Sequence, residues 1–293
     1  MMNTEQKQKI QQRLALYVQR YPSQNMAANS LKDISPATIS NILTGKWSKI
    51  SEEMWLRLES QLVKNEGWQL FGTAAYRDML LFLGDAQAES SVMWVTAPAG
   101  IGKSTAASVY ASTHPNVFRL TCASDMTKTD FVHELASQIG VRTGGMSVRG
   151  AFQEILRNLV VKDRPLLIFD EADKLADSVM YYFISIYNAL EDRCGIVFLS
   201  TDAIKARIRK GVMRDKKGYD ELESRIGRRF VGLTRVTSAE IEQICYANGL
   251  NDRRAIALVK KDASEFGNDL RRVKRSVHRE LLQMEVSSTD QEA

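Results

Sequence analysis

Cysteine, histidine and proline are scarce in this chain, and long apolar runs are missing. Three widely separated cysteines argue against a disulfide framework or a structural zinc site, and five prolines with 17 glycines exclude a collagen-like or low-complexity chain. The longest apolar stretches, such as residues 166–169 and 196–199, are strand-sized and too short to span a membrane. The polar first twelve residues contain no apolar core of a signal peptide. We therefore expect a soluble, cytoplasmic protein with no membrane partner.

The length of 293 residues suffices for one full hydrophobic core with one or two small additional domains. Positive charge is concentrated in the last third of the chain. Residues 205–279 contain 20 Lys and Arg against 10 Asp and Glu, whereas the rest of the chain is mildly acidic. Such a basic segment favours a polyanionic partner, first of all nucleic acid. The alternative is a basic surface that only faces solvent.

Three blocks follow one another along the chain. In residues 1–65, short amphipathic segments, with Ser35-Pro36 as a helix start and Gly45 as a helix stop, predict a string of short helices. We interpret this block as a helix-turn-helix DNA-binding domain, in keeping with the family resemblance described below. Residues 66–235 alternate helix-length segments with β-like apolar runs, which predicts parallel βαβ units and a nucleotide-binding α/β core. Those runs are 92–97, 117–122, 165–173 and 195–201. Residues 236–293 predict a helical block with a polar tail, the third domain of the chain.

The segment from Ala97 to Ser104 has the form of a phosphate loop. It fits the pattern GxxxxGK[ST] except that Ala97 replaces the first glycine, and it lies between an apolar strand and a helix, as this motif requires. In such a loop, backbone N–H groups bind phosphate oxygens; Lys103 would reach the β- and γ-phosphates, and Ser104 or Thr105 would be a Mg²⁺ ligand. The predicted nucleotide-binding residues of this loop are Pro98, Ala99, Gly100, Ile101, Gly102, Lys103, Ser104 and Thr105.

A second, acidic motif begins at Asp170, directly after the apolar run 166–169. At the end of a buried strand, Asp170 would lie beside the phosphate loop and hold Mg²⁺ through water, while Glu171 would polarise the attacking water. Asp173 is expected to cap the next helix. Because the two motifs occur together, they predict a Mg²⁺-dependent nucleotide site with Ser104 and Asp170 as its metal ligands.

The spacing of these motifs resembles that of the AAA+ ATPases, and further positions match. Thr201, after an apolar run, matches the first sensor of that family, and Arg271 in Gly267-Asn-Asp-Leu-Arg271 matches the second. Arg225 resembles the arginine finger that reaches the γ-phosphate of a neighbouring subunit, with Arg228 and Arg229 as competitors for the role. The resemblance implies an α/β P-loop NTPase with a parallel sheet, a small N-terminal all-α domain and a C-terminal helical lid, which hydrolyses ATP with Mg²⁺.

The overall layout resembles the B transposition proteins of Mu-like phages and related transposition helper ATPases. The resemblance rests on the repressor-like segment 35–47, the phosphate loop, the acidic motif, the segment 223–229 and the second-sensor motif. It implies a protein that binds double-stranded DNA without sequence specificity and self-associates with ATP into helical filaments. Such a protein captures target DNA, delivers it to a transposase and disassembles when ATP is hydrolysed.

Two segments are candidate DNA contacts. The first is the basic run after the fourth apolar stretch, which would contact phosphates, and its residues are Lys205, Arg207, Arg209, Lys210, Lys216 and Lys217. The second is the start of the expected recognition helix, where Thr38 and Asn41 would contact bases or phosphates. The N-terminal block could instead bind a protein such as the transposase.

Two other functions fit the same motifs. A replication helper that loads a helicase would prefer single strands or forks, and an ATP-switched helix-turn-helix transcription regulator would prefer one DNA site. In each case hydrolysis would be an in-line attack of water on the γ-phosphate, with Glu171 orienting the water. Lys103 and Arg225 would stabilise the negative charge of the transition state, and Thr201 would be the sensor residue.

Overall fold

The computed structural model describes residues 4–18, 24–29, 31, 33–65, 68–226 and 230–289. The chain divides into two compact units, Met1–Gln69 and Leu70–Ala293. Within the described ranges, no helix is long and apolar enough to cross a membrane. The finer division into blocks 1–65, 66–235 and 236–293 stays a prediction.

The first unit is a bundle of short helices. Its elements are α1 (Thr4–Val18), α2 (Gln24–Asn29), α3 (Pro36–Leu43), a 3₁₀ turn (Trp47–Lys49) and α4 (Glu52–Asn65). Helix α3 starts as the sequence predicts: Ser35 accepts a hydrogen bond from the Thr38 backbone N–H at 3.1 Å, and Pro36 is the first helical residue. Gly45 follows the end of α3 with a φ of 77°, a left-handed conformation that glycine adopts without steric cost.

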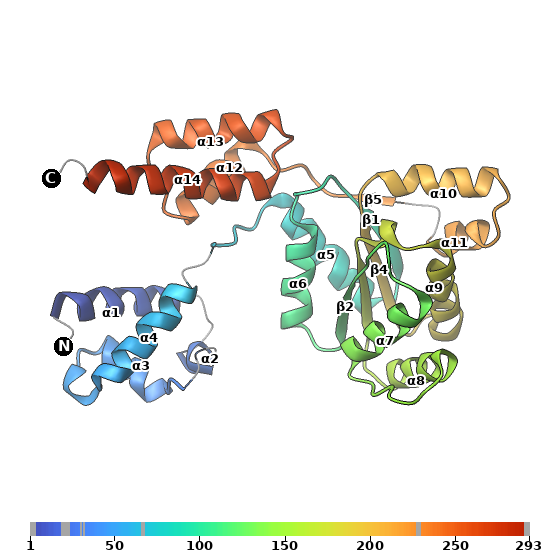
Figure 1. Ribbon diagram of the computed structural model, residues 1–293, viewed down its shortest axis with the longest axis horizontal. Coiled ribbons are helices and arrows are strands. Elements are labelled where there is room, and N and C mark those ends of the chain that lie inside the picture. The colour runs from blue at the N-terminus through green and yellow to red at the C-terminus, as the bar shows by residue number, and fades with distance from the viewer. Residues whose placement is uncertain are drawn as a thin grey trace. The chain divides into compact units, whose positions relative to one another are not determined.

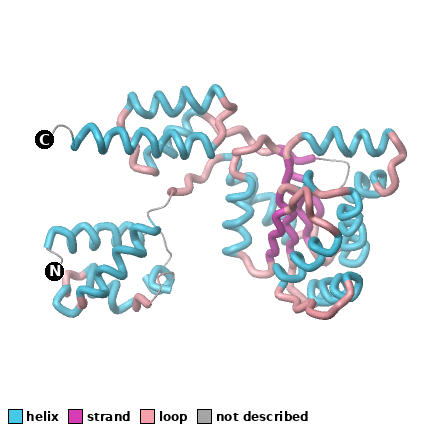
Figure 2. The backbone as a smooth tube through the Cα atoms, viewed as in Figure 1, coloured by secondary structure: helices cyan, strands magenta, loops and turns pink. Residues whose placement is uncertain are grey.

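The second unit is built on a parallel sheet (Figures 1 and 2). Its strands are β1 (Val92–Thr96), β2 (Val117–Thr121), β3 (Leu166–Asp170), β4 (Gly195–Ser200) and β5 (Phe230–Gly232). They lie in the order β2-β3-β4-β1-β5, and every neighbouring pair is parallel. The expected parallel α/β architecture is confirmed, and the short strand β5 is an addition that the apolar pattern did not indicate.

Helices cover both faces of the sheet (Figure 1). One face carries α5 (Ala74–Ala88) and α6 (Lys103–Thr113), and the other carries α7 (Lys128–Ile139), α8 (Val148–Val160) and α9 (Asp177–Leu190). Strand β3 shows the division, because Leu166 and Ile168 pack with α5 and α6, whereas Leu167 and Phe169 pack with α7 to α9. Burial on both faces explains why the strands are continuous apolar runs.

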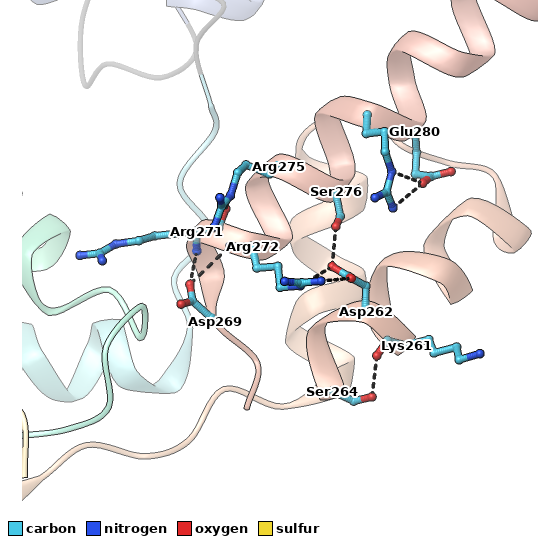
Figure 3. Close-up of polar contacts among 10 residues, drawn as sticks. Lys261, Asp262, Ser264, Asp269, Arg271, Arg272, Arg275, Ser276 and Glu280 are labelled. Carbon is cyan, nitrogen blue, oxygen red and sulfur yellow. Dashed lines mark hydrogen bonds and ion pairs between the residues drawn. The ribbon is translucent and has the colours of Figure 1, made fainter. Parts of the chain in front are cut away.

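Two helical segments complete the second unit. Helices α10 (Ala203–Met213) and α11 (Tyr219–Arg225) follow β4. The lid helices α12 (Ser238–Ala247), α13 (Arg253–Glu265) and α14 (Leu270–Thr289) follow β5. Asp262 joins α13 to α14, because it accepts hydrogen bonds from Arg272 at 2.7 and 2.9 Å and from the Ser276 hydroxyl at 2.7 Å (Figure 3).

Candidate nucleotide site and basic surface

The phosphate loop connects β1 to α6. Gly100 and Gly102 have φ angles of 78° and 103°, in the left-handed region where a side chain would be strained. Ala97 has no such angle; its N–H continues the sheet by donating to the carbonyl of Ser200 at 3.2 Å. The bend of the loop therefore depends on the two glycines, and an alanine is compatible with the first position of the motif.

Lys103 lies at the start of α6 and bends back over the loop. Its ammonium donates to the carbonyl of Ala97 at 2.6 Å and to that of Pro98 at 2.9 Å. Burial lowers the pKa of Lys103, the nearby Arg271 lowers it further, and the aspartates around the loop, Asp170 first among them, oppose both effects. Lys103 and Arg271 thus bring two positive charges to a helix N-terminus, an arrangement suited to an anion.

Asp170 is a buried carboxylate at the end of β3, with 1% of its surface exposed. Its Oδ1 accepts the Glu171 backbone N–H at 3.0 Å, and its Oδ2 accepts two hydrogen bonds from Arg119 of β2, at 2.7 and 3.3 Å. The sequence reasoning missed Arg119. The available signal was its position: Arg119 is a charged residue within the otherwise uncharged strand β2, two positions before the end of that strand.

The composition of the site fits Mg²⁺ held together with phosphates. Among the described residues, no three or more His, Cys, Asp or Glu side chains gather into a metal cluster. Mg²⁺ does not need one, because it is commonly bound by one or two carboxylates together with the substrate's phosphates. From the described residues, Oδ1 of Asp170 accepts one hydrogen bond, which leaves a lone pair that could accept from a metal-bound water.

Glu171 has a φ of 58°, unusual for a residue with a side chain. It begins a short 3₁₀ turn, Ala172–Lys174, and its carboxylate is paired with Lys174 at 2.5 Å. Left-handed backbone at a non-glycine residue costs free energy and is concentrated at functional sites. The geometry is consistent with a positioned carboxylate beside the phosphate loop.

The sequence suggested that Asp173 caps the next helix, but in the structure it does not. Its carboxylate accepts the Thr201 hydroxyl at 2.8 Å, and the N-terminal cap of α9 is Ala176. The reason is tertiary: β4 lies beside β3, so the residue that follows β4 reaches the turn that follows β3. The contact brings the predicted sensor Thr201 next to the acidic motif.

The start of α14 meets the phosphate loop. The Leu270 N–H donates to the carbonyl of Gly100 at 2.9 Å, and a Cβ added to Gly100 would lie 2.2 Å from the Asp269 carboxylate. Asp269 also accepts the backbone N–H of Arg271 at 2.7 Å, and Figure 3 shows the Arg271 side chain extending away from the lid helices. The start of α14 thus places Arg271 beside the phosphate loop, close enough to Lys103 to lower its pKa.

Arg225 ends α11 and packs within its own chain. Its guanidinium lies 4.9 Å from the ring centre of Tyr187 and 3.7 Å from a carboxylate oxygen of Glu221. Arg228 and Arg229 lie outside the described residues. The choice among the three candidate fingers therefore stays open.

The predicted basic run divides into two sets on α10 and its following turn. Lys205 and Lys216 form ion pairs with Asp202 and Asp177, and Arg207 donates into the interior of the unit. Arg209, Lys210 and Lys217 are exposed, and within the described part of the chain their side chains form no ion pair. We expected Arg207 on the outer surface of α10 with the other basic residues. In the structure it lies next to the buried side of that helix, which is formed by Ile204, Ile208 and Gly211.

In the first unit, Thr38 and Asn41 lie in α3 and are half-buried. The Thr38 hydroxyl is 2.9 Å from that of Ser35, so it belongs to the helix cap. The role of both residues in DNA contact stays a prediction, as do the roles of the other site residues.

The fold and the phosphate loop are typical of AAA+ P-loop NTPases. A family model described as "AAA domain" matches residues 87–203, which span β1, the phosphate loop, the acidic motif and β4. The similar curated proteins include those of two phages and one prophage. The chain is 24% identical over 202 residues to the Mu-like prophage FluMu DNA transposition protein B of Haemophilus influenzae, which covers 68% of each protein.

Two further relatives carry one name. The ATP-dependent target DNA activators B of Escherichia phages Mu and D108 are each 24% identical over 245 residues, 80% of this chain and 76% of theirs. Among solved structures, that of a Thermotoga maritima RuvB mutant is similar to this chain with a TM-score of 0.37 and 15% sequence identity. The match covers 70% of this chain and 68% of the RuvB chain. The chain thus contains an AAA domain and is similar to transposition proteins B over most of its length.

Proposed function

We propose that this protein is an ATP-dependent DNA-binding helper of DNA transposition. The observation that carries the proposal is the agreement of three relatives, two named target DNA activators and one DNA transposition protein, over 68–80% of the chain. The phosphate loop and the acidic motif support the ATP-dependent part. The exposed basic residues of α10 support the DNA-binding part.

ATP would be held by the loop N–H groups, with Lys103 and Arg271 facing its phosphates. Ser104 and Asp170 would hold Mg²⁺, which supplies charge neutralisation at the phosphate oxygens when it is bound. Glu171 would orient the attacking water. Thr201 would act as the sensor of the γ-phosphate, and its hydrogen bond to Asp173 would link it to the acidic motif. Hydrolysis to ADP and phosphate is the reaction that this set of residues supports.

Duplex DNA would be bound without base specificity. Arg209, Lys210 and Lys217 are exposed on and just after one helix, so they can contact phosphates together. Thr38 and Asn41 in α3 would add a second contact. Because phosphate contacts release counterions, binding should weaken steeply with salt and vary little with sequence.

Self-association would be linked to ATP. An arginine finger, one of Arg225, Arg228 and Arg229, would reach the nucleotide of a neighbouring subunit, so that the nucleotide forms part of the interface. An interface that repeats without closing produces a helical filament on the DNA. A transposase would receive the captured target DNA, and hydrolysis would release the subunits.

Electron microscopy with random-sequence duplex DNA tests the proposal. We expect continuous filaments with ATP and none with ADP or without nucleotide, and a Glu171→Gln variant should keep its filaments because it does not hydrolyse ATP. Closed rings with single-stranded or forked DNA would favour the replication helper, and binding to one preferred duplex site would favour the regulator. Unchanged ATP turnover by Glu171→Gln would remove Glu171 from the mechanism.

A further inference from the structure

Helix α10 presents two different sets of basic side chains. Arg209 and Lys210 face solvent, whereas Arg207 turns toward the acidic motif and is only 28% exposed. Three residues of one basic run are thus split between an outer surface and an internal contact. The internal contact lies next to the residue proposed to orient water, Glu171.

All three guanidinium nitrogens of Arg207 donate within the unit, and Nε donates to the hydroxyl of Tyr219 at 3.3 Å. Nη1 donates to the carbonyl of Asp173 at 2.9 Å, and Nη2 donates to the carbonyl of Leu175 at 2.7 Å. Both carbonyls belong to the chain that follows Glu171, on either side of Lys174. Because the planar guanidinium has a fixed fork of donors, it holds two backbone oxygens in one geometry.

A carboxylate locks this arginine in place. Asp177, at the start of α9, accepts Nη2 of Arg207 at 2.5 Å and the hydroxyl of Tyr219 at 2.7 Å, and it is ion-paired with Lys216. Burial alone would raise the pKa of Asp177, but the hydrogen bonds from Lys216, Arg207 and Tyr219 hold it far below its usual value. The carboxylate therefore stays ionised, and the rotamer of Arg207 is fixed at neutral pH.

The same helix has a second tie to the same turn. Thr201, two residues before α10 begins, donates its hydroxyl to the carboxylate of Asp173 at 2.8 Å. The turn is thus joined to α10 through a side chain at one end of the helix and through backbone carbonyls in its middle. A shift of α10 would move both contacts and, with them, the backbone next to Glu171.

We propose that Arg207 is a positioning residue that couples α10 to the turn carrying Glu171, so that a polyanion bound on the outer face of α10 alters ATP hydrolysis. Arg207 does not contact the polyanion. The inference deepens the proposed function and rests on the assignment of Glu171 as the water-orienting carboxylate.

An Arg207→Gln variant tests the coupling. Because a displacement of about 1 Å at a reacting group can cost about a hundredfold, we expect kcat for ATP to fall about ten- to a hundredfold, with KM and the affinity for a fluorescent ATP analogue changed by less than about threefold. Arg207→Lys, which keeps the charge but not the fork, should recover part of kcat. Tyr219→Phe, which removes one hydroxyl but keeps the ring, should show a smaller loss in the same direction.

A matched control separates positioning from general damage. Arg157→Gln removes an arginine that is 73% exposed and paired with Glu154 of the same helix, α8, so kcat and KM should equal those of the unchanged protein. Thermal unfolding of every variant shows whether the fold is intact. If Arg207→Gln loses nucleotide affinity and kcat together, in proportion to a loss of folded protein, the role is only structural and the proposal fails.

Duplex DNA provides the second readout. Arg207→Gln should keep the salt dependence of DNA binding, whereas Arg209→Gln should reduce its slope by about one, the loss of one phosphate contact. The factor by which random-sequence duplex changes the hydrolysis rate should fall toward one in Arg207→Gln. An altered salt slope in Arg207→Gln, or no effect of DNA on hydrolysis by the unchanged protein, would overturn the coupling.

Failure of this inference is distinguishable from failure of the proposed function. If Glu171→Gln is inactive and Arg207→Gln hydrolyses ATP normally, with and without DNA, only the coupling is wrong. If Glu171→Gln hydrolyses ATP at the normal rate, the catalytic assignment itself is wrong, whatever Arg207→Gln does.

Discussion

Replacing Arg119 by methionine would leave the Asp170 carboxylate buried without its cationic partner. In the native structure that carboxylate is 1% exposed and accepts both Nη2 and Nε of Arg119, at 2.7 and 3.3 Å. Methionine keeps much of the length of the arginine stem but offers no donor. The remaining hydrogen bond to Asp170, from the Glu171 N–H, satisfies only one oxygen.

The size of the effect follows from burial. Removing one partner of a buried ion pair costs about 3–5 kcal/mol, because an uncompensated charge is left in a medium of low polarity. The side chain of Arg119 is 26% exposed, so water can reach part of the vacated space, and we take the lower end, about 3 kcal/mol. For a unit of this size, about 2–4 °C of Tm per kcal/mol gives a loss of about 6–12 °C.

Thermal unfolding and urea titration would measure the loss, with Arg157→Met as the control. Arg157 forms an exposed pair with Glu154, so its replacement should cost less than about 1 kcal/mol. The double variant Arg119→Met, Asp170→Asn should recover at least about 1 kcal/mol relative to Arg119→Met, since a neutral amide is cheaper to bury than a lone carboxylate. If the double variant is as unstable as Arg119→Met, or if Arg119→Met unfolds like the control, the reasoning about the buried charge is wrong.

Three further predictions concern packing, pH and a helix cap. Gly211→Ala should lose about 1–2 kcal/mol, because the new Cβ would lie 2.2 Å from the buried ring of Tyr219. Asp177→Asn should lose most stability relative to the unchanged protein above about pH 5. The difference should shrink as the pH falls below about 3.9, the pKa of an aspartate in the unfolded chain. The reason is that the pKa of Asp177 is lowered in the folded protein, so its hydrogen bonds stabilise the fold only while the carboxylate is ionised. Ser35→Ala should destabilise the first unit by about 1 kcal/mol, because it removes the cap of α3.

Each of these has a control within the chain. Gly84 lies inside α5 with the nearest atom to an added Cβ at 3.8 Å, so Gly84→Ala should stabilise the protein; equal losses in both glycine variants would contradict the packing argument. A stability difference for Asp177→Asn that stays constant down to pH 2 would contradict the linkage. Ser40→Ala, at an exposed position within α3, should cost less than Ser35→Ala.

The two sequence segments that form the candidate nucleotide site could be recognised from local pattern, and their roles stay predictions. Ala97–Ser104 and Asp170-Glu171 could be recognised because binding a phosphate chain and Mg²⁺ needs a flexible loop, a helix N-terminus and a strand-end carboxylate at fixed positions along the chain. The cap of α3 at Ser35 and the parallel sheet were predictable for a similar reason, since caps and apolar strands are properties of neighbouring residues.

The sequence by itself determined the α/β class, the phosphate loop and the acidic motif, since each depends on residues close together in the chain. Only the tertiary structure decided what the charged residues do. It turned Arg207 inward from a basic run, directed Asp173 to Thr201 instead of to a helix end, and brought Arg119 to Asp170 from another strand. The physical reason is that a buried charge is stable only with a partner, and the partner is set by which strands and helices are neighbours, a property that no local pattern records.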